Sequence, residues 1–223
     1  DLALCARRTD RLEELKAELT DRHPFIKVAI AELDVNDHDR VPEVFGRLAD
    51  ELGGLDRVIV NAGLGKGWPL GGGKLYANKA TIETNLVAAL VQIETALELF
   101  KRTGSGHLVL ISSVLANKGV PGHKAAYAAS KAALHPYAYD LAADLGERGI
   151  TVNVVAPGYI AGTEFFRGTL SAERERTLIA QTHTGRPGTP ADVAAAVHWL
   201  ASPEAGHITG QIIQINGGAE RGR

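Results

Sequence analysis

The chain has 223 residues, 45% of them hydrophobic, and a formal net charge of −2 at pH 7, which suits one well-packed domain and, without any basic stripe, argues against a nucleic-acid partner. Its apolar runs are far too short to cross a membrane, and its first residues lack the basic-then-apolar pattern of a secretion signal, so we expect no membrane partner. Cys5 is its only cysteine and its eight histidines lack ligand-like spacing, which together favour a cytoplasmic protein without a disulfide or a metal site.

Short β-branched runs alternate with longer helical patterns along the chain. The runs are apolar on successive residues, as in strands buried on both faces, and they cover 2–6, 26–33, 57–61, 107–112, 150–156 and 211–215. Helical stripes fill the intervals, as at 9–21, 41–52 and 190–200. This alternation predicts an α/β, Rossmann-like fold: a doubly wound, mostly parallel sheet in three α/β/α layers, as one domain over residues 1–223.

The first predicted strand, 2–6, resembles the second strand of a nucleotide-binding fold. In doubly wound nucleotide-binding folds a strand and its glycine-rich turn come before this point, and the turn offers N–H groups to the pyrophosphate. We therefore expect that the sequence given lacks a first βα unit of roughly 30 residues. The sheet would then lack a central strand.

Two arginines, Arg7 and Arg8, stand where the first strand meets its helix. In related folds an acidic residue at this place bonds the ribose 2′-hydroxyl of NAD, whereas guanidinium groups match a 2′-phosphate in shape and charge. The pair favours NADP(H) over NAD(H). The alternative is that both side chains are simply solvated at a helix entrance.

The strand at 57–61 runs into VNAG, and the glycines of the following GLGKG (63–67) lack the G-x-G-x-x-G spacing. We expect a mobile loop beside the site. Further on, Asn85 lies inside a helical stretch, where its amide competes with backbone bonding. Such an asparagine either faces solvent or faces a kinked backbone or an ordered water.

The strand at 107–112 ends in Ser112 and Ser113, at the carboxyl edge where open α/β sheets bind ligands. Ser113 can donate a hydrogen bond to a carbonyl, although serines also commonly end strands. Tyr127 and Lys131 follow, four residues apart on one helix face, where an ammonium favours the phenolate and lowers the tyrosine pKa. Such a spacing also arises by chance, so the pair alone is weak evidence.

Residues 164–188 carry Phe165, Phe166, Leu170 and Leu178 among many charges. The pattern suits a movable substrate lid, and it equally suits an ordinary amphipathic surface helix.

Six motifs in chain order resemble those of the short-chain dehydrogenase/reductase family: LDV (33–35), VNAG (60–63), ETN (83–85), ISSV (111–114), AYAASKAAL (126–134) and VAPGYI (155–160). The resemblance runs from residue 2 to about residue 218, and the ending resembles the 3-oxoacyl-thioester reductase branch. It implies that Tyr127 is the general acid or base and that Lys131 binds the nicotinamide ribose. It also implies that Ser113 orients the substrate carbonyl and that Asn85 holds a water that relays protons from Lys131.

The resemblance further implies cofactor-binding positions besides Tyr127, Lys131 and the two arginines. They would line the adenosine side, contact the adenine, border the nicotinamide or touch its carboxamide: Asp34, Val35, Asn61, Ala62, Gly63, Pro157, Gly158, Ile160 and Thr163. Two intervals depart from the family by one residue, from Ser113 to Tyr127, with the extra residue in 121–127, and before Thr163.

The leading hypothesis is an oxidoreductase that transfers a hydride between NADP(H) and a carbonyl or secondary alcohol. The alternative is a non-catalytic truncated homologue that keeps the fold for assembly or ligand sensing. An epimerase or dehydratase on nucleotide sugars would use the same Tyr-Lys pair, but the chain is short for one. The resemblance also implies a homo-oligomer, a dimer or tetramer, assembled through the helices around 75–102 and 123–147.

Overall fold

The computed structural model describes residues 1–223 except 66, 120–123, 167–169 and 221–223. The strands are β1 (Leu2–Ala6), β2 (Val28–Glu32), β3 (Arg57–Val60), β4 (Gly106–Ile111), β5 (Ile150–Pro157) and β6 (Ile212–Ile215). Each lies within a residue or two of its predicted range.

The longer helices are α1 (Thr9–Arg22), α2 (Arg40–Leu52), α3 (Leu75–Ile82), α4 (Ala88–Thr103), α5 (Ala125–Ala132), α6 (Leu134–Leu145), α7 (Ala172–Ala180) and α8 (Pro190–Leu200). A π-helical turn, Glu83–Val87, joins α3 to α4. Short 3₁₀ turns cover Val114–Ala116, Gly146–Arg148, Glu164–Phe166 and Pro203–Ala205. A capping box begins the helix predicted at 190–200: the side chains of Thr189 and Asp192 each accept a hydrogen bond from the other's backbone N–H.

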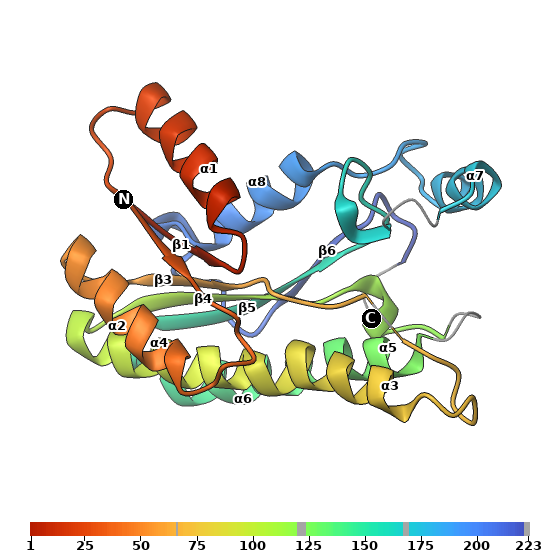
Figure 1. The fold of residues 1–223 in the computed structure, drawn as a ribbon, viewed down its shortest axis with the longest axis horizontal. Coiled ribbons are helices and arrows are strands. Elements are labelled where there is room, and N and C mark those ends of the chain that lie inside the picture. Colours follow the sequence, from red (N-terminus) through yellow and green to blue (C-terminus); the bar gives the residue numbers. More distant parts are fainter. Residues whose placement is uncertain (66, 120–123, 167–169, 221–223) are drawn as a thin grey trace.

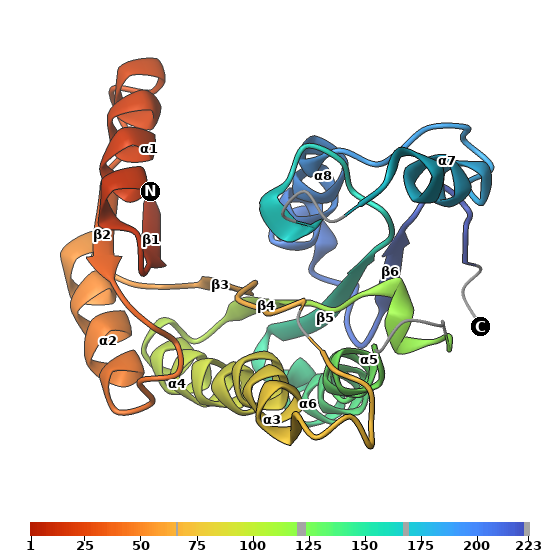
Figure 2. The same ribbon diagram turned by 45° about the vertical axis from the view of Figure 1, so that its right-hand side comes forward.

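All strand pairs are parallel, as the unbroken apolar runs predict. β1 pairs with β2, and a second sheet has the order β3-β4-β5-β6. Within the described residues β1 and β3 are not paired, so the predicted continuous sheet is interrupted between them. Figure 2 shows the β1–β2 pair set off from the four-stranded sheet.

Helices cover both faces of the four-stranded sheet (Figures 1 and 2). Leu108 and Leu110 of β4 belong to the large core that includes residues of α4 and α6. Val109, between them, packs with Leu200 of α8 on the other face. Side chains alternate across a strand, so a strand covered on both faces is apolar at every position, which gives the observed sequence pattern.

The tight fit extends to Gly106 at the start of β4, where a Cβ would lie 2.5 Å from the Phe100 ring. In the part of the chain that the structure describes, no helix has the length and apolar character needed to cross a membrane.

Candidate active site

The side chains of Ser113, Tyr127, Lys131 and Asn85 gather where β3 and β4 end, at the carboxyl edge of the sheet. Tyr127 of α5 is buried, with 6% of its surface exposed. Burial raises the pKa of its phenol, and a hydrogen bond with the Ser113 side chain opposes this rise. The pKa of Tyr127 therefore lies above its ordinary value, which corrects the expectation that Lys131 lowers it.

Lys131 lies one turn further along α5 and is also buried. Its Nζ donates a 2.7 Å hydrogen bond to the carbonyl oxygen of Ile111, the last residue of β4. Burial lowers the pKa of this ammonium from 10.5 to about 8, because a charge loses its hydration inside the protein.

Asn85 faces the protein interior at the π-helical turn, and its exposed fraction is 0%. Its Oδ1 accepts a 2.6 Å hydrogen bond from the Leu64 N–H, while its Nδ2 donates to the Leu64 carbonyl and to the Ser130 hydroxyl. Asn85 therefore does not face solvent: it lies within the distorted part of the helix, and its side chain faces the Leu64 backbone and Ser130. Single π turns recur at functional sites in helices. The proposed water relay stays a prediction.

Gly63, in the segment that follows β3, lies beside the side chains of Lys131 and Asn85. A Cβ at Gly63 would lie 3.2 Å from the Lys131 Nζ and 3.3 Å from the Asn85 Oδ1. A side chain here would crowd both groups, so the glycine of VNAG keeps the space beside the lysine open. Asn61 and Ala62 precede it, directly after β3.

The two serines after β4 have different surroundings. Ser113 contacts Tyr127, and its Oγ also accepts a hydrogen bond from the Leu115 N–H. Ser112 instead donates to the Lys131 carbonyl oxygen and pairs with the His135 ring. Residues 121–123, within the stretch that carries the extra residue, lie outside the described part.

Aromatic rings from the predicted lid cover Tyr127. The rings of Phe165 and Tyr127 meet edge to face with 5.9 Å between centroids, and Phe165 also contacts Phe166, which in turn contacts Tyr159. Gly65 lies beneath Phe165, where a Cβ would come within 2.5 Å of the ring. The 3₁₀ turn at 164–166 thus lies over the candidate site, while 167–169 of the predicted lid lie outside the described residues.

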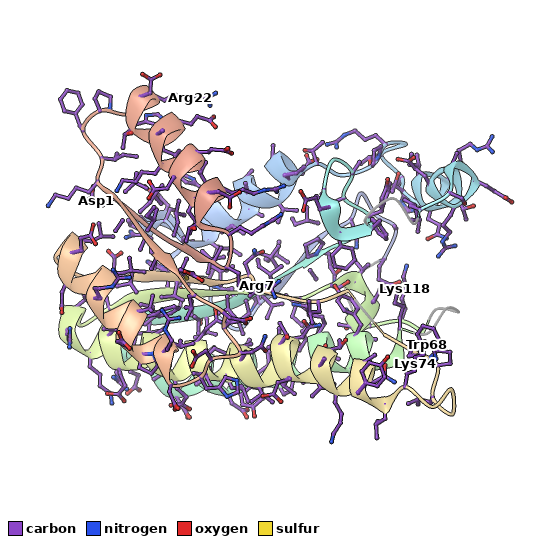
Figure 3. The ribbon with its side chains drawn as sticks, in the orientation of Figure 1. Asp1, Arg7, Arg22, Trp68, Lys74 and Lys118 are labelled. Carbon is purple, nitrogen blue, oxygen red and sulfur yellow. The ribbon has the colours of Figure 1, made fainter. Side chains whose placement is uncertain are left out.

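The loop after Gly63 lies beside the site, as predicted, and reaches α3. The Lys124 Nζ donates to the Gly65 carbonyl, and Asn78 of α3 exchanges two hydrogen bonds with the Trp68 backbone. The Lys74 Nζ lies 3.7 Å from the centroid of the Trp68 ring, and Figure 3 shows this pair at the end of the molecule far from Arg7. The loop's mobility stays a prediction.

A basic cluster follows β1. Arg7 lies 3.7 Å from an Asp34 carboxylate oxygen. Arg8 and Arg11 both bind the Glu164 carboxylate, at 3.1 and 2.8 Å. Hydrogen bonds from Arg11 and then Arg8 lower the pKa of Glu164. Arg8 is therefore an exposed side chain that is also paired with an anion. Arg11 was not among the predicted cofactor-binding residues, although its position three residues after Arg8 would have indicated that the two side chains share a helix face.

The remaining predicted cofactor positions lie at the ends of β2 and β5. Asp34 and Val35 are half-buried, and the Asp34 Oδ1 accepts hydrogen bonds from Asn36. Pro157 ends β5, and the Gly158 N–H donates to β6. Ile160 forms a bridge with Gly188, and Thr163 is exposed. Among the described residues, no group of three acidic, histidine or cysteine side chains is arranged to hold a metal ion.

Comparison with known proteins finds relatives that are named as reductases or oxidoreductases. A family model described as enoyl-(acyl carrier protein) reductase matches residues 1–220. An uncharacterized oxidoreductase of Mycobacterium tuberculosis (strain ATCC 25618 / H37Rv) is 72% identical over 160 residues, which cover 72% of this chain and 63% of that protein. The 3-oxoacyl-[acyl-carrier-protein] reductase of Vibrio cholerae is 35% identical over 186 residues, covering 83% of this chain and 75% of the relative.

Solved structures agree with the fold. An NADPH-dependent reductase involved in bacilysin biosynthesis superposes with a TM-score of 0.91 at 26% identity, covering 100% of this chain and 89% of the other. A gluconate 5-dehydrogenase from Burkholderia cenocepacia, in complex with NADP and tartrate, gives a TM-score of 0.89 at 26% identity, over 97% of this chain and 84% of the other. The Rossmann-like α/β fold is therefore confirmed.

Proposed function

Because this chain belongs to the short-chain dehydrogenase/reductase family, we propose that it is an NADP(H)-dependent oxidoreductase acting on a carbonyl or secondary alcohol. The observation that carries the proposal is the buried cluster of Tyr127, Ser113, Lys131 and Asn85 at the sheet's carboxyl edge. The named relatives and structures are oxidoreductases, reductases or dehydrogenases, and none of them favours the non-catalytic alternative.

In the direction of reduction, Tyr127 gives its proton to the substrate oxygen. Burial raises the pKa of this phenol, so at neutral pH Tyr127 carries the proton that the substrate oxygen receives. Ser113, hydrogen-bonded to the phenol, donates to the same substrate oxygen and orients it. NADPH, when bound, supplies the hydride that the carbonyl carbon receives. In the direction of oxidation Tyr127 removes the proton of the alcohol.

Lys131 serves as the proton source behind Tyr127 and binds the ribose next to the nicotinamide. A pKa of about 8 lets its amine lose and regain a proton near neutral pH. Its Nζ and the Asn85 Oδ1 both face Gly63, so an ordered water held by Asn85 would connect the lysine to solvent. These roles follow from the family resemblance, and the shared burial of the four side chains supports them.

The charge arrangement supports NADP(H) as the cofactor. Arg8 and Arg11 hold the two oxygens of one carboxylate, an arrangement of two guanidinium groups that also suits the oxygens of another anion. A 2′-phosphate presents the same kind of oxygens with more charge. We therefore assign Arg8, with Arg7 beside it, to the 2′-phosphate. To the adenosine side of the cofactor we assign Asp34, Val35, Asn61, Ala62 and Gly63. To the nicotinamide side we assign Pro157, Gly158, Ile160 and Thr163.

A 3-oxoacyl thioester is the substrate class we favour, since the relatives include 3-oxoacyl-[acyl-carrier-protein] reductases. Residues 164–188 act as the lid within a single domain, and the Phe165 ring over Tyr127 supports this role. We further propose that the protein is cytoplasmic and that it assembles as a homo-oligomer, either a dimer or a tetramer.

The test is a reduction assay with purified protein, NADPH or NADH, and a panel of 3-oxoacyl thioesters, ketones and aldehydes. We expect consumption of NADPH with at least one thioester, and a clear preference for NADPH over NADH. Equal use of both cofactors would contradict the assignment of Arg8. Tight NADPH binding without turnover of any carbonyl would favour the non-catalytic alternative.

A further inference from the structure

The proposed mechanism does not use His135, which is buried behind the catalytic helix with 7% of its surface exposed. Its Nε2 lies 3.0 Å from the Ser112 Oγ, and that hydroxyl lies 2.9 Å from the carbonyl oxygen of Lys131. Ser112 is itself 3% exposed, and its backbone N–H donates to Val155 of β5. The three residues thus form a chain of hydrogen bonds from α6, across the end of β4, to α5.

The direction of these bonds follows from counting protons. A carbonyl oxygen only accepts, so the single hydroxyl proton of Ser112 goes to Lys131. The Ser112 Oγ must then accept from His135, which requires a proton on Nε2. Burial lowers the pKa of His135, so the ring is neutral near pH 7 and the bond defines which nitrogen is protonated.

Two consecutive residues at the end of β4, Ile111 and Ser112, therefore bind Lys131, one at its side chain and the other at its backbone carbonyl. Its Nζ donates to the Ile111 carbonyl, and its own carbonyl accepts from the Ser112 hydroxyl. The helix is interrupted close to this bond. α5 ends at Ala132 and α6 begins at Leu134, and Pro136 has no N–H to offer to the Ala132 carbonyl, which follows that of Lys131. Ser112 supplies a donor next to this interruption.

We propose that His135 and Ser112 are positioning residues, a buried relay that fixes the helix turn carrying Lys131 and, one turn before it, Tyr127. The proposal rests on the proposed function, because it assigns the relay to the same site. A helix turn that is free to shift misplaces both the proton donor and the ammonium, and displacements of about 1 Å at a reacting centre can cost roughly a hundredfold in rate.

The kinetic test compares His135→Leu with His135→Gln. Leucine fills the space without a donor, whereas glutamine places an amide N–H close to the position of the imidazole Nε2. We expect His135→Leu to lower kcat about tenfold or more with little change in KM for the carbonyl, and His135→Gln to restore kcat to within about threefold of the wild type. Ser112→Ala should match His135→Leu, and the double variant should be no slower than either single variant.

A matched control lies at the other end of the same strand. The His107 Nδ1 is 2.9 Å from the Thr151 hydroxyl, and burial lowers the pKa of His107 as well. His107→Leu removes a comparable histidine–hydroxyl bond without touching α5, so kcat should stay within about twofold of the wild type. Equal losses in the two leucine variants would show a general effect of folding and would overturn the proposal. So would an unchanged kcat in His135→Leu.

A second readout does not depend on activity. In ¹⁵N-labelled wild-type protein, the ring shifts should show His135 protonated at Nε2 and bare at Nδ1, and Ser112→Ala should change them. A ring protonated only at Nδ1 would overturn the relay even if the enzyme is active. A wild type without turnover on any carbonyl, but with the expected ring shifts and the expected response to Ser112→Ala, would contradict the proposed function and leave the relay standing.

Discussion

Replacing Lys131 with methionine tests whether burial of the Lys131 ammonium lowers the free energy of unfolding of the protein. Methionine has a similar length and carries no charge. Burial lowers the pKa of the Lys131 ammonium from 10.5 to about 8. A lysine with that difference between the unfolded and folded states destabilises the fold by about 3 kcal/mol at pH 7. The substitution removes this cost.

The substitution also removes a hydrogen bond. The Ile111 carbonyl loses the donor that lies 2.7 Å away, and an unsatisfied buried acceptor costs about 1–3 kcal/mol. The two effects oppose each other. We therefore expect Lys131→Met to be as stable as the wild type or up to about 2 kcal/mol more stable at pH 7, while its turnover is lost.

The pH dependence separates the charge from the hydrogen bond. Between pH 8 and 10.5 the unfolded chain keeps the Lys131 proton that the folded protein has released, so the stability of the wild type rises with pH. From pH 7 to about 9.5 this contributes roughly 2 kcal/mol. Urea unfolding of both proteins at the two pH values measures it, since other titrating groups are common to both. Parallel pH dependences would refute the argument, because the ammonium would then not be desolvated.

Three further variants probe the surroundings of the site. Glu164→Gln releases Arg8 and Arg11 and should lower KM for NADPH about two- to fivefold, an effect that high salt should reduce and that an unchanged KM would contradict. Phe165→Ala removes the ring over Tyr127 and should raise kcat/KM for bulky ketones relative to small ones, whereas an equal effect on both would exclude a role in selection. Thr189→Ala breaks the capping box of α8 and should cost about 1 kcal/mol in urea unfolding without changing kcat.

Much of the fold was predictable because burial on both faces leaves a direct trace in sequence. Leu108, Val109 and Leu110 are apolar in succession, and the structure places them alternately against the helices below and above the sheet. The exact strand ends were not predictable, since they depend on backbone pairing that side chains do not specify.

The gathering of Ser113, Tyr127, Lys131 and Asn85 was implied by the family resemblance, and spacing alone placed only Tyr127 near Lys131, whereas the electrostatics of the group were not predictable. A Tyr-x-x-x-Lys spacing indicates proximity, whereas the pKa of Tyr127 depends on how far α5 is buried. The contact between Arg8 and Glu164 joins residues 156 positions apart. No local pattern predicts such a pair. His135 lies four residues after Lys131, yet only the fold shows that Ser112 links them.

The central claim is that the Tyr127 hydroxyl, hydrogen-bonded to Ser113, moves the proton. The most direct measurement is NADPH-dependent carbonyl reduction by the wild type and by Tyr127→Phe, with NADPH affinity measured separately by fluorescence titration. We expect a loss of at least about a thousandfold in kcat/KM, with Kd for NADPH within about threefold of the wild type. A phenylalanine variant that keeps about a tenth or more of the wild-type rate would contradict it.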